Sequence, residues 1–474
     1  MSFLSMKNTK ILLVALVALI ILRIPSLFEP HWYGDEGIYA AITYGMESGK
    51  VLYTELWDNK PPLIYYLYSF GEPHNRLFVI RALNLIAGLI TLVGLWKLTE
   101  LLNISKKARN IGIIFATLIL GTPILEGNIA NAENFFVPLI IFGYIFMLLK
   151  KPRYVVSGIL FGTAFLFKFH PFFDFAAAGL FLLFTQKSSK KTLLLLSGFF
   201  IPLLLQGGIL FFQGNLNEAI SIIFLNNFNY TQSYSSGIKS IEFRSLVLVI
   251  GLAFSSWLFY AKRISQQIYF LSLLLLFEVY AGLFGGRRYV HYLIQVIPAA
   301  VLISSYIVER TLEEKERVTK RLAYPVTLIL GFWIFLRIFM FGEGIAMRYD
   351  IPKYYGDFIS YAAKEKPYFI SNVDDRFNQL NNVLQQYDKK DMYIYSNNAW
   401  LYDVLEVYPP IPVIVGYHRT FVGEDNFIEM LTTALPATIV YDTLADPSDD
   451  LSLLLNEQYV FDRSINEYQI WIKK

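Results

Sequence analysis

The chain has 474 residues, of which 55% are hydrophobic and 17% are charged, and its mean hydropathy is +0.44. Ordinary soluble proteins are much less apolar, so this composition excludes that class and indicates a chain that crosses a membrane several times. The net charge of +3 excludes the basic excess typical of nucleic-acid binding, and the absence of cysteine excludes disulfides and thiolate metal sites.

Membrane-length apolar runs follow one another through the first three quarters of the sequence. We count about eleven such runs, and each is close to the roughly 20 residues that a helix needs to cross a bilayer. The first run follows basic residues and lacks a small-residue cleavage site, so we interpret it as a retained signal anchor. The sequence therefore predicts a polytopic α-helical membrane protein. The runs centre near Val17, Ile86, Thr117, Ile141, Phe161, Leu180, Leu203, Leu248, Leu273, Ile297 and Leu330.

Clusters of basic residues separate these runs, and all six fall on one side if the helices alternate. By the positive-inside rule, that side is cytoplasmic. We therefore expect a multi-pass protein of the inner or plasma membrane, with a cytoplasmic N-terminus and an extracytoplasmic loop at residues 29–75. The clusters are Lys7/Lys10, Lys106/Lys107/Arg109, Lys150/Lys151/Arg153, Lys187/Lys190/Lys191, Lys262/Arg263 and the run from Glu309 to Arg321.

The composition becomes polar after residue 343. Short β-rich runs (PYFISN, DMYIYSNN, IPVIVGY, ATIVYD and YQIWIK) alternate there with helical stretches, which predicts a small α/β domain. We therefore expect a transmembrane domain at residues 1–343 and a soluble α/β domain at 344–474, which is extracytoplasmic because the number of spans is odd. An acceptor-binding module and a structural lid both remain open as its role.

Loop 29–75 carries the strongest candidates for chemistry. Asp35 and Glu36 open a segment with apolar residues at helical spacing, which predicts an amphipathic helix on the membrane surface. Asp35 is then either the N-cap of that helix or a reactive carboxylate. Lys60 stands before Pro61 and Pro62, and is either a snorkelling interface lysine or a point charge that binds phosphate.

Further charged residues fall at expected helix ends on the same side of the membrane. Arg287 and Arg288 stand out in loops otherwise poor in positive charge, so an anionic partner is the better explanation for them, since arginine grips phosphate bidentately. Each of the remaining residues is by itself more typical of an interface or an ion pair than of catalysis. They are His291, Lys168, His170, Glu126 and Glu133.

The sequence requires no cofactor. Its five histidines form no HExxH or similar metal motif. Carboxylates suit hard cations, so a divalent metal on Asp35, Glu36 or Glu133 stays open, although no spacing demands one.

The order of the motifs resembles the GT-C membrane glycosyltransferases, in the branch that includes the protein O-mannosyltransferases and the aminoarabinose transferase of lipid A. The resemblance rests on DEGIYA from Asp35, KPPLIYYL from Lys60 and VIRALNLIAGL with Arg81. It continues with Glu133, with GILFGTAFLFK ending at Lys168, and with RYVHYLIQVIPA, which contains Arg288 and His291. In some relatives an acid stands where this chain has Asn59.

This resemblance implies an inverting transferase that moves a sugar from a polyprenyl-phosphate donor to an extracytoplasmic acceptor. It implies Asp35 as general base, with Glu36 and Glu133 orienting the acceptor or holding a metal. The residues expected to bind the donor phosphate are Lys60, Arg287, Arg288, His291, Lys168 and Arg81. The partners are the lipid-linked donor, the acceptor (a protein, lipid or glycan) and the bilayer, with no nucleic acid.

Two other functions fit the same features. A ligase or polymerase of lipid-linked oligosaccharides uses similar chemistry on a larger donor. A flippase or transporter of lipid-linked sugars requires ionisable residues near the bilayer midplane and paired repeats with broken helices, whereas most charges in this sequence lie at helix ends.

Overall fold

The computed structural model describes residues 9–226, 241–285, 289–313, 350–364, 373–445 and 448–474. The chain divides into two compact units. The bundle unit comprises Met1–Ile24, Leu83–Gln206 and Phe228–Tyr354, and the loop unit comprises Pro25–Ala82, Gly207–Asn227 and Tyr355–Lys474. The expected domain boundary at residue 343 lies outside the described residues, so it stays a prediction.

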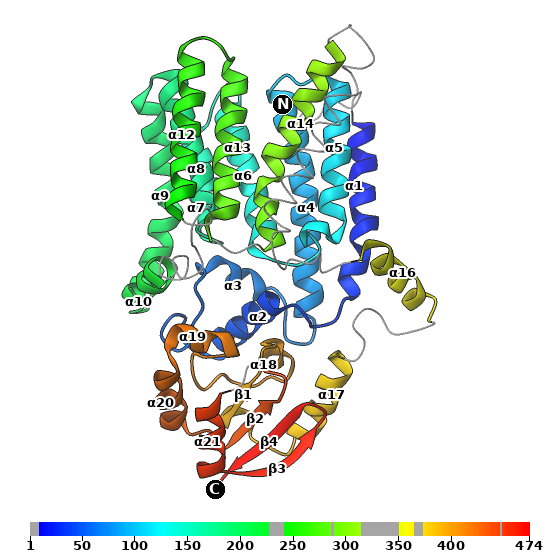
Figure 1. Cartoon of the computed structure of the whole chain (residues 1–474), viewed down its shortest axis with the longest axis vertical. Helices are drawn as coiled ribbons and strands as arrows, with labels where there is room; N and C mark the ends of the chain where they lie inside the picture. Colours follow the sequence, from blue (N-terminus) through cyan, green and yellow to red (C-terminus); the bar gives the residue numbers. More distant parts are fainter. Residues whose placement is uncertain (1–8, 227–240, 286–288, 314–349, 365–372, 446–447) are drawn as a thin grey trace. The chain divides into compact units, whose positions relative to one another are not determined.

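Apolar helices form the bundle unit (Figure 1). Its helices pack as the pairs α6 with α7, α8 with α13, α12 with α13, and α5 with both α1 and α14. The helices are α1 (Lys10–Arg23), α4 (Arg76–Leu101, which begins in the loop unit), α5 (Lys106–Gly121), α6 (Ala132–Leu148), α7 (Tyr154–Phe165), α8 (Pro171–Gln186), α9 (Ser189–Phe212, which ends in the loop unit), α12 (Ile241–Tyr260), α13 (Gln266–Phe284) and α14 (Ile297–Glu313). A 3₁₀ segment, η6 (Val290–Val296), precedes α14.

The expectation of a polytopic helical protein is confirmed in its general form. Six segments of the described residues are long and apolar enough to cross a membrane: Lys10–Phe28, Arg76–Leu101, Ser189–Phe212, Ile241–Tyr260, Gln266–Phe284 and Val290–Leu312. Helices α6, α7 and α8 are apolar but shorter. Each expected span from Val17 to Ile297 is centred on a helix or helix start. The span expected near Leu330 lies outside the described residues, so the total of eleven stays a prediction.

Glycines let two helices of the bundle approach closely. A Cβ at Gly158 in α7 would lie 2.1 Å from the carbonyl oxygen of Leu195 in α9, and one at Gly162 would lie 2.2 Å from that of Phe199. A Cβ at Gly198 in α9 would likewise lie 2.1 Å from the carbonyl oxygen of Val155 in α7. Small residues at four-residue spacing therefore bring the two backbones together, as is common between membrane helices.

We predict that Gly158→Ala destabilises the protein by about 1–3 kcal/mol, because the added methyl group forces two backbones apart. The measurement is the thermal unfolding midpoint in detergent. Gly179→Ala is the matched control, since a Cβ at Gly179 in α8 meets no atom within 4 Å. Equal unfolding midpoints for the two variants would contradict this packing.

The loop unit begins with two helices that carry the first two motifs. Helix α2 spans Gly34–Glu47 and α3 spans Leu63–Tyr68, and the two pack together. The helix expected after Asp35 is thus present, but residues 36–43 are all buried. The expected exposed polar face is absent over this stretch because α3 and the C-terminal residues pack on it.

The C-terminal part of the loop unit contains a four-stranded sheet with the order β1-β2-β4-β3. Strands β1 (Met392–Tyr395) and β2 (Thr438–Asp442) are parallel, whereas β4 (Tyr468–Lys473) pairs antiparallel with both β2 and β3 (Tyr459–Ile465). The helices are α10 (Leu216–Ile220), α16 (Ile351–Ala362), α17 (Val373–Leu384), α18 (Trp400–Val404), α19 (Arg419–Val422), α20 (Glu424–Ala434) and α21 (Asp449–Gln458), some of which flank the sheet in Figure 1.

Three of the five β-rich runs contain strands in the structure. PYFISN lies outside the described residues. The prediction for IPVIVGY was wrong: Val413, Ile414 and Val415 are buried but form no strand. Prolines at 409, 410 and 412 remove ladder donors, so this segment fills the core as irregular chain. Strand β3 (YVFDRSI) was missed because its apolar residues do not alternate with polar ones, and most of the strand is exposed.

Candidate functional site

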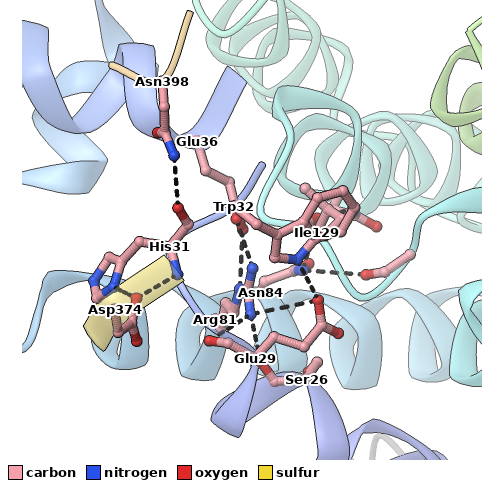
Figure 2. A network of polar contacts seen from close by, with 12 residues as sticks. Ser26, Glu29, His31, Trp32, Glu36, Arg81, Asn84, Ile129, Asp374 and Asn398 are labelled. Carbon is pink, nitrogen blue, oxygen red and sulfur yellow. Dashed lines mark hydrogen bonds and ion pairs between the residues drawn. The ribbon is translucent and has the colours of Figure 1, made fainter. Parts of the chain in front are cut away.

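A buried arginine organises the start of the loop unit (Figure 2). Arg81 is fully buried and donates from Nε to Oε1 of Glu36 at 3.2 Å and from Nη2 to Oε2 at 2.8 Å. Its Nη1 donates to the carbonyl oxygens of Ser26 and Glu29 and lies 3.6 Å from the Glu29 carboxylate. Such a bidentate pair, with its remaining donors satisfied, is the arrangement in which buried charges are tolerated.

The two adjacent carboxylates therefore have different environments. Both oxygens of Glu36 accept hydrogen bonds from Arg81, so Glu36 holds the start of α2 in place. Asp35 lies in the first turn of α2 and is only half-buried. The N-cap of that helix is Tyr33, so Asp35 does not occupy the capping position considered from the sequence.

Tyr68 of α3 lies within the electrostatic reach of both carboxylates. Burial raises the pKa of its hydroxyl well above the ordinary value, and the charges of Glu36 and Asp35 act in the same direction. Tyr68 therefore stays protonated at neutral pH and keeps a hydroxyl donor beside the first turn of α2.

Lys60 is held by its own loop. Its side chain is 13% exposed, and its Nζ lies 3.5 Å from Oδ2 of Asp58 and 5.1 Å from the centre of the Tyr39 ring. The Tyr65 hydroxyl donates to the same Asp58 oxygen at 2.8 Å. The ammonium group is thus positioned in a partly open site between a carboxylate and an aromatic face.

The sequence reading missed Asp58. It treated Asn59 as a departure from relatives that carry an acid before the lysine. The structure shows that Asp58, one residue earlier and almost fully buried, supplies a carboxylate to Lys60. The signal was present in WDNKPP, but only the folded loop shows which side chain turns toward the lysine.

Three tyrosines connect the two motifs of the loop unit. The Tyr39 ring of α2 meets the rings of Tyr65 and Tyr68 edge to face, with centroids 6.1 and 5.4 Å away. All three side chains are buried. The structure thus brings Asp35, Glu36, Lys60 and Arg81 into one packed region of the loop unit.

Four other candidates form pairs within the bundle unit. Nζ of Lys168 lies 2.5 Å from Oε1 of Glu133, which is in the first turn of α6, and 4.0 Å from the centre of the Tyr292 ring. His291 Nδ1 lies 2.9 Å from Oε2 of Glu126, a pairing that the sequence reading did not anticipate. These residues therefore form two buried acid–base pairs at the ends of helices.

Two further acids of the bundle unit were not named from the sequence: Asp174 in the first turn of α8 and Glu278 within α13. Asp174 accepts hydrogen bonds from the Tyr144 hydroxyl at 3.1 Å and from the Gln295 amide at 2.6 Å. Glu278 accepts from the backbone N–H of Ala299 at 2.9 Å. These contacts hold η6 and the start of α14. A charged residue within an apolar run was the available signal for both acids.

Arg287 and Arg288 lie outside the described residues, so their expected contact with phosphate stays a prediction. Within the described ranges, no group of three or more His, Asp or Glu side chains is arranged to hold a metal ion. Glu36 and Glu133, two of the three metal candidates, each form an ion pair with a basic side chain.

Comparison with known proteins identifies the fold. Residues 59–207 match the family model described as dolichyl-phosphate-mannose-protein mannosyltransferase. The chain is similar to the crystal structure of ArnT from Cupriavidus metallidurans bound to undecaprenyl phosphate, with a TM-score of 0.56, 16% identity and 98% of both chains covered. The chain is also similar to the apo structure of ArnT from the same organism, with a TM-score of 0.53, 15% identity and 97% of both chains covered. No curated protein sequence matches the chain.

The chain has the GT-C glycosyltransferase fold. The resemblance read from the motifs is therefore confirmed. The matched segment of the family model contains Lys60, Arg81, Glu133 and Lys168, whereas DEGIYA precedes it. At 15–16% identity the two structures establish the fold, and the roles of individual residues rest on the geometry described above.

We predict that Arg81→Ala lowers the free energy of unfolding by about 3–5 kcal/mol, because it leaves the Glu36 and Glu29 carboxylates buried without their partner. The double variant Glu36→Gln/Arg81→Ala should cost less than the single changes Glu36→Gln and Arg81→Ala added together, since it removes both charges of that pair. Denaturant unfolding in detergent measures both.

The control for this pair is Arg463→Ala, which removes an exposed ion pair with Asp462 and should leave stability nearly unchanged. Strict additivity of the two changes at Glu36 and Arg81 would show that the ion pair does not organise this region.

Proposed function

We propose that this protein transfers a sugar from a polyprenyl-phosphate donor to an acceptor on the extracytoplasmic face of the inner or plasma membrane. Three observations support this function: the GT-C fold, the mannosyltransferase family match and the likeness to a protein crystallised with undecaprenyl phosphate. The six basic clusters support the expected topology, with a cytoplasmic N-terminus, an extracytoplasmic loop 29–75 and an extracytoplasmic C-terminal domain.

The observation that carries the proposal is the different environment of the two adjacent acids. Glu36 is buried and saturated by Arg81, whereas Asp35 is half-buried in the first turn of a fixed helix. A partly exposed carboxylate held on a rigid element can accept a proton from a substrate. We therefore assign Asp35 as the general base and Glu36 with Arg81 as the pair that positions it.

In this mechanism, Asp35 takes the proton from an acceptor hydroxyl as its oxygen attacks the anomeric carbon. The bond from that carbon to the phosphate oxygen breaks, and its electron pair leaves with the polyprenyl phosphate. Attack opposite the leaving group inverts the anomeric centre. Lys60, already partly desolvated, supplies positive charge to the phosphate as negative charge develops there.

The remaining basic candidates take supporting roles in the proposal. Arg287 and Arg288 are assigned to the donor phosphate on their sequence pattern alone. Lys168 is paired with Glu133, and His291 is hydrogen-bonded to Glu126, so both can contribute to a phosphate site only together with these acids. Glu133 orients Lys168 in this scheme, and metal use stays open.

We predict that Asp35→Asn lowers the transfer rate by at least about 10²-fold, the order of effect for removal of a general base. The amide keeps the shape of the side chain, so folding and membrane insertion should be preserved. The assay measures polyprenyl phosphate released from a polyprenyl-phosphate sugar by purified protein in detergent, in the presence of a hydroxyl acceptor.

Asp375→Asn is the matched control, because Asp375 is an exposed acid in the first turn of helix α17 of the same unit. It removes a helix-terminal charge without touching loop 29–75, so its activity should match the wild type. Full activity of Asp35→Asn would overturn the assignment of the base. In the same assay, donor consumption excludes a pure flippase, and a product with one added sugar excludes a polymerase.

A further inference from the structure

The C-terminal residues of the loop unit pack directly on the first turn of α2. A Cβ at Gly37 would lie 2.8 Å from the backbone nitrogen of Trp400 and 2.9 Å from its ring atom Cδ1. Trp400 begins α18 and is fully buried. Because glycine has no side chain, the start of α18 reaches the α2 backbone only two residues after Asp35.

C-terminal residues also hold the segment that precedes α2, through contacts to His31 (Figure 2). Asp374 of α17 accepts hydrogen bonds from the backbone N–H of His31 at 3.1 Å and pairs with its Nδ1 at 2.9 Å. Asn398 donates to the carbonyl oxygen of His31 at 3.1 Å, and the His31 ring meets that of Trp400 edge to face at 4.8 Å.

The Asp374 contact persists at neutral pH. Burial by itself would raise the pKa of Asp374, but the hydrogen bonds from His31 bring it below its usual value. The carboxylate is therefore ionised at neutral pH and remains an acceptor for His31.

The other end of α2 is held by a buried arginine. Arg76 is fully buried and donates to both carboxylate oxygens of Glu47, the last residue of α2, at 3.2 and 2.7 Å. The same guanidinium donates from Nε to Asp403 of α18 at 2.9 Å and from Nη1 to the carbonyl oxygen of Tyr68 at 2.8 Å. A single planar cation thus ties the end of α2 to α18 and α3.

We propose that the C-terminal domain sets the position of Asp35, with Trp400 and Asp403 as positioning residues that act through Gly37 and Arg76. This inference rests on the proposed function, because it assigns the domain a role in the same reaction. Both ends of α2 are fixed by α18, so the helix cannot shift without breaking a backbone contact or a buried ion pair. The domain is thereby part of the catalytic architecture and acts on the reaction through α2.

The test compares Gly37→Ala with Gly34→Ala, two identical changes in the first turn of α2. A Cβ at Gly34 meets no atom within 4 Å, whereas one at Gly37 meets the Trp400 backbone. We expect Gly37→Ala to lower kcat by about 10- to 100-fold with the donor KM unchanged, since small displacements of a catalytic group have effects of that order. Gly34→Ala should keep the wild-type kcat.

Asp403→Asn is a second variant. It weakens the ion pair with Arg76 at the C-terminal end of α2 and adds no volume near Asp35. It should also lower kcat at constant donor KM, and the pH profile of kcat should shift because the surroundings of the base change. A rise in acceptor KM with unchanged kcat would instead identify the domain as an acceptor-binding module and overturn the proposal.

Amide hydrogen exchange gives a readout that does not depend on activity. Gly37→Ala should speed exchange in the first turn of α2 and in α18, whereas Gly34→Ala should not. Unchanged exchange in Gly37→Ala would overturn the positioning role whatever the kinetics show. A wild-type protein that transfers no sugar would overturn the proposed function, and the exchange measurement would then decide whether α18 holds α2.

Discussion

The buried charge of Arg81 is the constraint on which the rest of the loop unit depends. Removing a guanidinium from water costs several kcal/mol unless ionic and hydrogen-bonding partners replace the solvent. Glu36, Glu29 and the carbonyl oxygen of Ser26 supply those partners, and each comes from chain that precedes or begins α2. Satisfying one charge therefore fixes the path of the backbone that presents Asp35.

The same principle recurs at the far end of α2, where Arg76 is shared between Glu47 and Asp403. Two buried arginines thus hold a single helix, and one of them, Arg76, also binds Asp403 of the C-terminal domain. The two adjacent acids of the DEGIYA motif therefore differ in their environment: Glu36 is buried and paired with Arg81, whereas Asp35 is half-buried in the first turn of α2. A site built on such a helix is held more rigidly than one on a free loop.

The sequence predicted features that follow from local pattern. Membrane-length apolar runs, the helix after Asp35 and the sheet strands around Ile394 and Val440 have periods or lengths that a single chain displays. The GT-C fold was predictable because several motifs occurred in a fixed order. What could not be predicted were partners far apart in sequence: Arg81 with Glu36, His291 with Glu126 and Gly37 with Trp400. Those pairs depend on tertiary contacts that local spacing does not determine.

We propose that the lipid-linked donor places its phosphate at Lys60 and its sugar toward Asp35. The most direct test is an experimental structure of the full chain with a polyprenyl-phosphate sugar bound. We expect a phosphate oxygen within hydrogen-bond distance of Lys60 Nζ and Asp35 on the face of the sugar opposite the phosphate. A phosphate bound elsewhere, with Lys60 still against Asp58 and Asp35 remote from the anomeric carbon, would contradict it.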